Sequence, residues 1–519
     1  MAQKEWFKPR GYPHISNKIT TEDKWLFNYV MNREKVAKHG FLPLIHKKLP
    51  QRRFKIVGHD STGKSIRGHK KSKDGIVTSN KKLRPICYAT HIDTHIYAYY
   101  SMLLQEKYEN LLKLTPDLSK CISAYRRIPT EDNKGNKNNI HFARDVFEVI
   151  LERKSNCCAM AFDIESFFNS LNHDLLKKAW SKLLGTKSLP KDHYNVFKSI
   201  TQFSYILLSD LRMSGKNVGF DERKLAFYRR QGVNAYFSSV AEFREQVKTG
   251  KLNIYRNQYH DKSKNKKIRG IAQGLPISAM LANLYLLEFD KEVYDEVVGT
   301  FKGTYRRYSD DLVIICDEKD AEEVKYFVIN RIKRLLLEIS EAKTEICFFR
   351  RNTEGILHSY MLDTQHGKEQ KGKPFCYLGF EFYGDCVRIK ATKLANFYRR
   401  MKSAVKRKIK RTQQANSKNL SNDFVIFKRQ LYRSFTRQGK KPRLLPKTII
   451  EYRKDKSTGY NVANRKTISR KYRGNYLNYV SRSSIILKDI GGKAITLQLR
   501  KHERILFDYL QSKIDKLEL

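Results

Sequence analysis

Three carboxylates are the residues of this chain with the clearest chemical potential. Asp310 and Asp311 lie side by side in YRRYSDDLVII (305–315), and Asp163 ends the apolar strand-like part of CCAMAFDI (157–164). Adjacent like charges repel and strands disfavour Asp, so the pair forms either a solvated turn between two strands or part of a site for a strongly positive group. Acids at strand ends can converge in space even when they are far apart in the sequence.

Few His or Cys residues accompany these acids, which favours a hard, oxygen-binding cation over zinc. We therefore expect two Mg²⁺ ions, for which Mn²⁺ could substitute. Two such ions about 3.5–4 Å apart can activate a 3′-hydroxyl and stabilise a leaving pyrophosphate in an in-line displacement. The acids would repel one another until the metals bind, so the site would stay open and hydrated without them.

The charge balance indicates a polyanionic partner. The chain has 519 residues, of which 40% are hydrophobic, and this suits several folded domains. Its 103 Lys and Arg residues against 53 acids give a formal charge of +50, spread over the whole length. Because 30 Tyr and 28 Phe residues are interleaved with these cations, the composition suits a groove that follows a nucleic-acid backbone and stacks bases. A ribosomal or other passive RNA-binding protein would also fit.

The cysteines and the N-terminus bear on the compartment. Eight cysteines are present without C-x-x-C spacing, so we expect buried thiols in a reducing environment rather than a zinc site. The N-terminal residues form no apolar signal region, and no run of about 18 apolar residues occurs. These observations predict a cytoplasmic protein with no membrane partner.

One motif matches a pattern that its surroundings do not support. GHDSTGKS (58–65) fits the phosphate-binding loop G-x-x-x-x-G-K-S. That loop requires a helix starting at its Lys-Ser end, whereas IRGHKKSKDG follows here, with two glycines and no apolar face. We expect a basic loop or hairpin over 58–82 instead of an NTPase site.

Hydrophobic periodicity predicts the elements that would position the acids. A hairpin should surround the Asp pair, and a long helix should follow the turn at 274–276. Thr21 would cap a helix over 19–32, and a very basic, helical region should begin near residue 390. The further strands that we expect are 157–164, 342–349 and 375–384.

Several short segments follow one another in a characteristic order. FDIESFF (162–168) comes first, QGLP (273–276) precedes a helix, YSDD (308–311) lies in a hairpin, and Lys343–Thr344 and YLGF (377–380) follow. This succession resembles the reverse transcriptase family, with its first catalytic block, nucleotide block, second catalytic block, lysine block and primer grip. LRP (83–85) and YRR (125–127) resemble parts of the fingers of that family.

The resemblance implies an α+β, right-hand polymerase with fingers, a palm with an antiparallel sheet, a helical thumb and basic extensions. The activity that it implies is RNA-directed DNA synthesis from dNTPs, a nucleotidyl transfer. The expected division is an N-terminal extension at 1–82, fingers at 83–156, a palm at 157–385 with a basic insertion at about 205–269, and a basic thumb with a C-terminal extension at 386–519.

The resemblance also implies roles for single residues. Asp163, Asp310 and Asp311 would be catalytic and bind metal, with the Ile164 carbonyl as a further ligand. Phe168 matches the steric-gate position, where a bulky ring excludes a ribose 2′-hydroxyl and selects dNTPs. The other expected nucleotide contacts are Gln273, Gly274, Lys343, Arg84, Arg126 and Arg127. The expected primer grip comprises Tyr377, Leu378, Gly379 and Phe380.

Two basic segments are candidates for RNA binding. In the insertion, aromatic residues alternate with Arg and Lys, which suits a clamp for structured RNA or a surface for self-association; a solvated elaboration of the palm is the alternative. The helix expected over 396–412 is basic along much of its surface and could lie on RNA or stay in solvent. The candidate contacts are Tyr228, Arg229, Arg230, Arg399, Arg400, Lys406 and Arg407.

The rest of the sequence favours one branch of the family. The paired-Cys nuclease of group II intron proteins, the acid-containing RNase H region of retroviral enzymes and the Val-Thr-Gly triplet of retron enzymes do not occur. FKPRGYPHIS (7–16), the insertion and the basic C-terminal region resemble the bacterial, defence-associated "unknown group" enzymes, which work with a non-coding RNA in anti-phage immunity. A maturase-like RNA-binding scaffold and a polymerase making untemplated, homopolymeric or protein-primed DNA remain alternatives.

Overall fold

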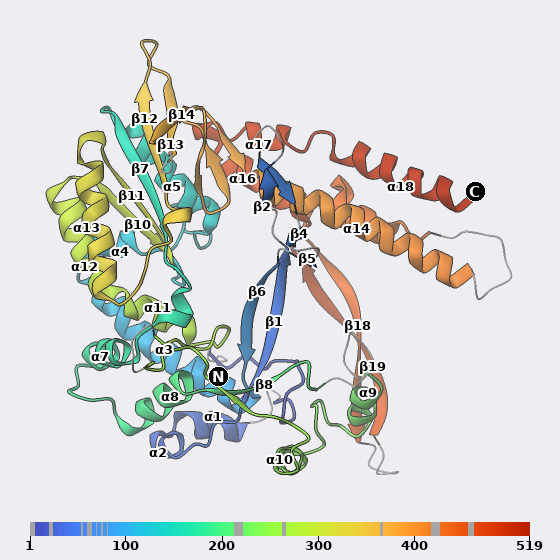
Figure 1. Ribbon diagram of the computed structural model, residues 1–519. Helices are drawn as coiled ribbons and strands as arrows, with labels where there is room; N and C mark the ends of the chain where they lie inside the picture. Colours follow the sequence, from blue (N-terminus) through green and yellow to red (C-terminus); the bar gives the residue numbers. More distant parts are fainter. Residues whose placement is uncertain are drawn as a thin grey trace.

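The computed structural model combines helices with mainly antiparallel sheets, which confirms the expected α+β class (Figure 1). None of the described helices has the length and apolar character needed to cross a membrane. The residues that the structure describes are 6–19, 24–52, 55–59, 65–68, 70–73, 76–79, 81–211, 222–261, 266–363, 367–416, 426–454 and 461–518.

A six-stranded antiparallel sheet carries the three acids. Its strand order is β10-β11-β7-β12-β13-β14, so β7 lies between the strand that follows the Asp pair and the strand that follows the lysine block. The expected strands at 157–164 and 342–349 correspond to β7 and β12. The strands are β7 (Cys157–Asp163), β10 (Thr304–Tyr308), β11 (Asp311–Asp317), β12 (Glu345–Arg351), β13 (Leu357–Asp363) and β14 (Lys368–Lys371).

Both faces of this sheet are covered, which explains the nearly continuous apolar runs of β7 and β11. Met160 and Phe162 face one large core, whereas Cys157 and Ala159 face a second one. The eight cysteines are all free thiols, and six of them are buried, as expected for small core residues.

The first core contains helices from the fingers side and the palm. These are α3 (His91–Lys113), α4 (Pro116–Cys121), α6 (Phe167–Ser170), α7 (His173–Leu184), α8 (Lys191–Thr201), α11 (Ser278–Tyr285), α12 (Leu287–Val293), the π-helix η1 (Tyr294–Thr300) and α13 (Ala321–Arg334). The second core joins the sheet to α5 (Asn139–Glu152), to a three-stranded sheet and to the C-terminal helices.

A second sheet joins three segments that are distant in the sequence. Its order is β6-β1-β8-β9, with β1 antiparallel to β6 and parallel to β8. The expected boundary at residue 82 therefore falls within paired strands, and the start of the expected insertion lies in the same sheet. The strands are β1 (Leu44–Arg52), β6 (Lys81–Tyr88), β8 (Ser204–Leu207) and β9 (Tyr255–Arg256).

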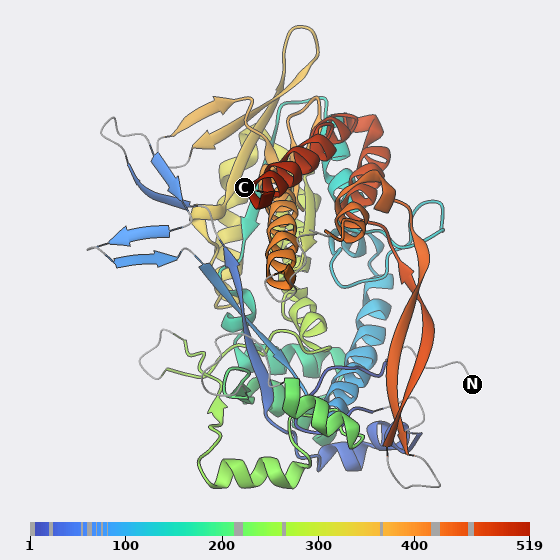
Figure 2. The same ribbon diagram turned by 90° about the vertical axis from the view of Figure 1, so that its right-hand side faces the viewer.

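Two small hairpins precede β6 and project from one side of the molecule in Figure 2. Ser65 begins a strand paired with β2, not a helix, so the phosphate-loop motif lacks the helix it requires. Gly63 and Lys64 lie outside the described residues, as does the expected helix cap Thr21. The strands are β2 (Lys55–His59), β3 (Ser65–Gly68), β4 (Lys70–Lys73) and β5 (Ile76–Ser79).

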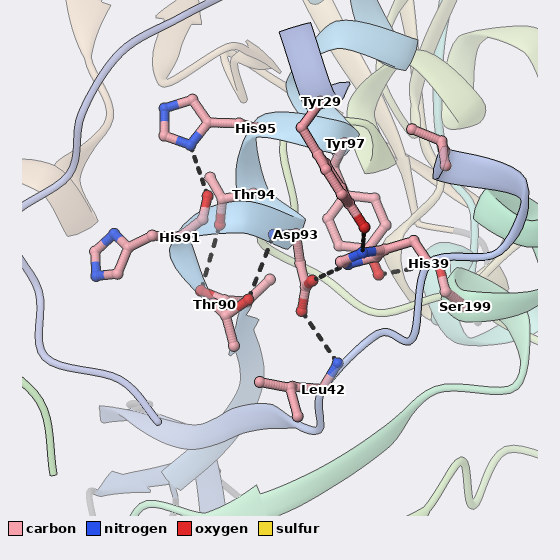
Figure 3. Close-up of polar contacts among 12 residues, drawn as sticks. Tyr29, His39, Leu42, Thr90, His91, Asp93, Thr94, His95, Tyr97 and Ser199 are labelled. Carbon is pink, nitrogen blue, oxygen red and sulfur yellow. Dashed lines mark hydrogen bonds and ion pairs between the residues drawn. The ribbon is translucent and has the colours of Figure 1, made fainter. Parts of the chain in front are cut away.

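A polar cluster ties α1 (Lys24–Met31) and the segment that follows α2 (Arg33–Ala37) to α3 (Figure 3). His39 Nε2 lies 2.8 Å from a carboxylate oxygen of the buried Asp93, and the Tyr29 hydroxyl lies 2.8 Å from His39 Nδ1. The other Asp93 oxygen accepts from the Leu42 amide at 3.2 Å. Asp93 thus satisfies groups from the N-terminal segment while it remains on the first turn of α3.

The insertion has a small core of its own. Helices α9 (Glu222–Arg230) and α10 (Val240–Lys248) pack there with Ile15 and Ile45 from the N-terminal part of the chain. The described part of the insertion is therefore folded against the N-terminal part of the chain and is not an extended loop.

The C-terminal region, expected to be a helical thumb with a C-terminal extension, also contains a long two-stranded ribbon, β18–β19. A three-stranded sheet leads into the helices, and its strands are β15 (Phe375–Tyr377), β16 (Phe380–Phe382) and β17 (Val387–Ile389). The other elements are α14 (Ala391–Asn416), α15 (Arg429–Phe435), β18 (Arg443–Lys454), β19 (Asn461–Tyr472), α16 (Tyr476–Ile486), α17 (Ala494–Leu497) and α18 (His502–Glu518).

Candidate active site

The register of the six-stranded sheet brings the three acids together. We call it the palm sheet, after the domain that the sequence resemblance implies. Asp311, the first residue of β11, pairs directly with Asp163, the last residue of β7. Residues directly opposite each other in an antiparallel pair share a face, so these two carboxylates lie side by side. Asp310 occupies the two-residue turn between β10 and β11, and its carbonyl accepts from the Ile164 amide at 3.3 Å. The alternative expected from the sequence, an isolated solvated turn between two strands, does not describe this arrangement.

Burial and neighbouring negative charges raise the pKa values of two acids in the site, Asp310 and Asp311. Partial removal from water raises the pKa of Asp310, and the charge of Asp163 adds to this effect. Asp311 is exposed by area, yet protein atoms crowd its carboxyl; this desolvation, followed by the charges of Asp310 and Asp163, raises the pKa of Asp311 to about 7. Lys343 and Lys390 act in the opposite direction on that group.

Lys343 lies where the lysine block was expected. It ends the 3₁₀ turn η3 (Glu341–Lys343), and its ammonium forms an ion pair with the Asp163 carboxylate. The side chain is 45% exposed, so it can change partner without unfolding its surroundings. Lys343 is thus the nearest positive charge that the described residues supply to Asp163.

The three side chains are carboxylates, which are the ligands that hard divalent cations prefer, and they repel one another when no cation is bound. Within the described ranges, however, no group of three His, Cys, Asp or Glu side chains is placed to hold a metal ion. The ion pair between Asp163 and Lys343 accounts for part of this difference from the expected three-carboxylate set. Asp163, Asp310 and Asp311 are the residues that would hold the metal.

A buried ion pair lies directly beneath the hairpin, and it was not predicted. Arg307 and Asp290 are both 0% exposed, and Arg307 Nε and one terminal nitrogen donate to the two carboxylate oxygens at 2.7 and 2.6 Å. The other terminal nitrogen donates to Asn283 Oδ1 at 3.0 Å and to the Ser309 carbonyl at 3.2 Å. Burial alone would lower the pKa of Arg307, but the Asp290 charge outweighs it and raises that pKa. Arg307 therefore fixes the turn that carries Asp310.

The YRR segment contributes differently from expectation. The Tyr125 hydroxyl shares a 3.0 Å hydrogen bond with the Ser309 hydroxyl, which places this half-exposed tyrosine beside the catalytic hairpin. The expectation that Arg126 binds a triphosphate is wrong, because its guanidinium is committed to Glu109 and to the Ser119 and Ile122 carbonyls and is 7% exposed.

Arg127 and Arg84 remain predicted nucleotide contacts. Arg127 is exposed on the loop that contains Tyr125. Arg84 is exposed on β6, opposite Leu49, and the same strand reaches the nucleotide block at Cys87.

The nucleotide block packs against the first catalytic block and the fingers. The Ile271 amide donates to the Phe168 carbonyl at 2.8 Å, and the Gln273 side chain donates to Asn169 Oδ1 at 3.2 Å. Gly274 has φ +104°, and a Cβ there would lie 2.6 Å from the Cys87 carbonyl oxygen, so only glycine allows this close approach. Phe168, which keeps part of its ring exposed, and Gln273 are therefore neighbours, as their expected roles require.

The YLGF segment forms a tight hairpin. Leu378 and Gly379 connect β15 to β16 with φ +44° and +93°, the paired positive values typical of two-residue hairpin turns. The Gly379 carbonyl accepts from the Lys390 amide at 3.0 Å, while Tyr377 and Phe380 are buried in the second core. The primer-grip role of Tyr377 to Phe380 stays a prediction.

The candidate RNA contacts divide into buried and exposed residues. Tyr228 is 8% exposed and donates to Glu242, so the expectation that it stacks on a base is wrong. Arg230 is exposed, and Arg229 donates to Asn234. On α14, Phe397, Met401 and Val405 face the second core. The residues exposed on its opposite side include Arg399, Arg400, Lys406 and Arg407.

The missed residues left a weak signal in the sequence. Asp290 follows Glu288 at the end of a mainly apolar helical run after QGLP, and Asn283 is the amide within that run. In β10, strand alternation places Tyr305 and Arg307 inward. A buried acid and a buried arginine near each other in the chain could have been paired on this basis.

Comparison with known proteins identifies one family. Residues 233–382 match the sequence model described as reverse transcriptase (RNA-dependent DNA polymerase). The matched part contains Gln273, Asp310 and Lys343 and begins after Asp163 and Phe168. No curated protein matches the chain.

Solved structures give a weaker likeness. The apo telomerase of Candida tropicalis, truncated from its C-terminal domain, is 10% identical with a TM-score of 0.37, over 72% of this chain and 61% of that chain. The Candida albicans telomerase in complex with a TWJ fragment of telomeric RNA is 10% identical with a TM-score of 0.32, over 71% of this chain and 50% of that one. The chain thus spans less than two thirds of these structures, and likenesses this low bear on neither substrate nor partner. The family match is thus to RNA-dependent DNA polymerases and extends over residues 233–382 of this chain.

Proposed function

We propose that this protein synthesises DNA on an RNA template and uses two Mg²⁺ ions to do so. One observation carries the proposal: Asp163 and Asp311 pair across the palm sheet, with Asp310 in the adjoining turn, and the hairpin lies within the part matched by the reverse transcriptase family. When bound, the ions would polarise the attacking 3′-hydroxyl and neutralise charge on the phosphates.

The chain's own residues perform the remaining tasks. The three aspartates would hold the cations, and Arg307 keeps the turn of Asp310 in place through the Ser309 carbonyl. Lys343 carries a mobile positive charge beside Asp163 that suits the leaving pyrophosphate. Phe168 is held by its neighbour Ile271 and would select dNTPs by crowding a 2′-hydroxyl.

We further propose that the template is an associated non-coding RNA, that the protein acts in the cytoplasm, and that the DNA serves anti-phage defence. The charge of +50 and the eight free thiols support the RNA partner and the compartment. The defence role is supported by the resemblance of the N-terminal segment, the insertion and the basic C-terminal region. The alternative, an RNA-binding scaffold, would not need the repelling carboxylates, whose desolvation costs stability.

The test is DNA synthesis by the purified full chain with Mg²⁺, labelled dNTPs and its co-purifying RNA, followed by sequencing of RNA and DNA. Asp310→Asn should abolish synthesis and leave RNA binding largely intact. Asp317→Asn makes the same chemical change at the other end of β11, where Asp317 pairs with Arg153, and should retain synthesis. Synthesis by the Asp310 variant would refute the site, and RNA without DNA from the unmodified protein would favour the scaffold.

A further inference from the structure

The ribbon β18–β19 is an unusual element for a protein in water. Its strands pair over their full length, from Arg443 with Tyr472 to Lys454 with Asn461, and among the described strands they pair with each other alone. A two-stranded hairpin is marginally stable by itself. Leu444 is 67% and Ile450 56% exposed on one face, and Arg443, Lys447, Lys466 and Arg470 are exposed on the other, so both faces are open to solvent. Such a ribbon is expected to bind a partner along its length.

On the face opposite Leu444 and Ile450, the register places the cations in a regular zig-zag. Four successive pairs on this face each join one cation to one apolar or aromatic residue, and the cation alternates between the strands. The pairs are Arg443 with Tyr472, Arg470 with Leu445, Lys447 with Ile468 and Lys466 with Ile449. We call Arg443, Lys447, Lys466 and Arg470 the cationic face.

The cationic face suits a polyanion. Successive pairs on one face of a ribbon are about 6.5–7 Å apart, so the charges form a line along the strands. All four side chains are exposed, and none forms an ion pair with an acid elsewhere in the described ranges. A line of unneutralised cations is expected to attract a continuous row of phosphates.

The line of cations continues into a hollow at the base of the ribbon. A cavity of about 430 Å³ lies between α15 and β18, and its lining includes Arg429 and Arg433 from the helix and Arg443 from the cationic face. The Tyr472 hydroxyl donates to the Arg433 and Gly439 carbonyls at 3.0 and 2.9 Å, which fixes the ribbon against the helix. The three arginines therefore line one hollow between elements that are joined by hydrogen bonds.

Both ends of the ribbon meet other basic elements. On another side of α15, a hollow of about 210 Å³ contains Arg407, Lys408 and Arg411 of α14. At the far end, α9 contacts β19, and its last turn carries Arg229 and Arg230 (Figure 1). Figures 1 and 2 both show the ribbon on the side of the molecule away from the palm sheet. The basic surface thus extends from the thumb to the insertion without passing through the candidate active site.

We propose that the cationic face, with Arg429 and Arg433, binds the phosphate backbone of a structured RNA and retains it outside the catalytic cleft. The wide, shallow minor groove of an RNA helix presents its phosphates to a flat surface, which suits a two-stranded ribbon lying across it. The choice of RNA over DNA rests on the proposed function, in which an RNA template is retained while DNA is made in the palm. Contacts to phosphate make this binding independent of sequence.

The test compares two double variants of β19 in the full chain. Lys466→Gln with Arg470→Gln removes one Lys and one Arg from the cationic face. Arg465→Gln with Lys471→Gln removes the same charges from the opposite face, at adjacent positions of the same strand. Binding of a labelled RNA stem-loop is measured from 50 to 200 mM KCl, with EDTA and without dNTPs, so the result does not depend on polymerisation.

In the cationic-face variant, loss of two phosphate contacts should reduce the magnitude of the slope of log affinity against log salt by roughly 1.5. Between 50 and 200 mM KCl, the unmodified protein should therefore lose about tenfold more affinity than this variant. The opposite-face variant should keep the original slope. Equal slopes for the two double variants would overturn the proposal. An equal loss with a DNA duplex of the same sequence would overturn the choice of RNA.

A charge-retaining exchange separates binding from folding. Lys466→Arg with Arg470→Lys keeps both cations and should retain the slope, and a loss in this variant would assign the effect to structure and refute the proposal. Failure of DNA synthesis by the unmodified protein would count against the proposed function, while the difference in RNA affinity between the two faces would still be measurable.

Discussion

The ion pair beneath the catalytic hairpin gives a prediction whose magnitude follows from burial. Arg307 and Asp290 are both 0% exposed. Arg307→Met retains much of the side-chain volume but leaves the Tyr305 hydroxyl, at 2.7 Å, as the remaining side-chain donor to Asp290 within the described residues. Removing one partner of a buried pair leaves an uncompensated charge, so the free energy of unfolding should fall by about 3–5 kcal/mol.

The matched control is an exposed pair in the same region. Lys182 and Glu288 lie 2.9 Å apart with side chains 64% and 47% exposed, so Lys182→Met should cost no more than about 1 kcal/mol. The double variant Arg307→Met with Asp290→Leu removes both buried charges and should recover at least about 2 kcal/mol of the loss.

Urea unfolding of the full chain, followed by tryptophan fluorescence, measures these differences, because Trp180 is buried in the same core as Tyr305. The reasoning fails if Arg307→Met costs no more than Lys182→Met, or if the double variant is as unstable as the sum of its single changes. DNA synthesis by Arg307→Met below its unfolding transition should also be slower, since the Ser309 carbonyl loses its donor.

Four further predictions concern the site and the thumb. Phe168→Ala should raise ribonucleotide incorporation, and an unchanged rNTP to dNTP ratio would count against the steric gate. Asp311→Asn should raise the thermal midpoint in EDTA more at pH 8 than at pH 5. The folded pKa of Asp311, about 7, exceeds the ordinary value of about 3.9, so ionisation of this carboxyl destabilises the fold increasingly as pH rises between these two values. Equal gains in thermal midpoint at both pH values would contradict this. Gly274→Ala should lower the thermal midpoint, because its Cβ would lie 2.6 Å from the Cys87 carbonyl oxygen, whereas Gly299→Ala meets nothing within 4 Å and should not. Replacing the exposed cations of α14 with Gln should weaken RNA binding and flatten its salt dependence, and no change would identify a solvated helix face; these cations are Arg399, Arg400, Lys406 and Arg407.

The palm was predictable because its strands carry a strong local signal. β7 and β11 are apolar on both faces, and each has an Asp at the end that faces the turn. The pairing of Asp163 with Asp311 then follows once the two strands are neighbours, because the register of an antiparallel pair fixes which residues are opposite. The order of the segments supplied that neighbour relation, which periodicity alone could not.

The errors arise where charge was interpreted without burial. Arg126 was expected to meet phosphate, yet its fork matches the Glu109 carboxylate and nearby carbonyls, and sequence shows no sign of that packing. Tyr228 was expected to stack on bases but fills the small core of the insertion region and donates to Glu242. The basic composition after residue 390 favoured helix, although the β-branched residues Ile, Thr and Val recur over 443–472, and such residues are enriched in strands.

The acids of the hairpin repel one another, whereas the charges of the ion pair beneath it neutralise each other. Together, the two features restrict how the repulsion at the site can be relieved. Asp310 cannot swing away freely, because its turn is fixed by Arg307 through Ser309 and its carbonyl accepts from Ile164. Arg307 cannot neutralise the acids of the hairpin, since its charge is already satisfied by Asp290. Relief must therefore come from protonation of an acid or from a cation outside this buried pair. Lys343 supplies one such charge to Asp163, while desolvation, followed by the charges of Asp310 and Asp163, still raises the pKa of Asp311, and a divalent ion bound there would counter both effects.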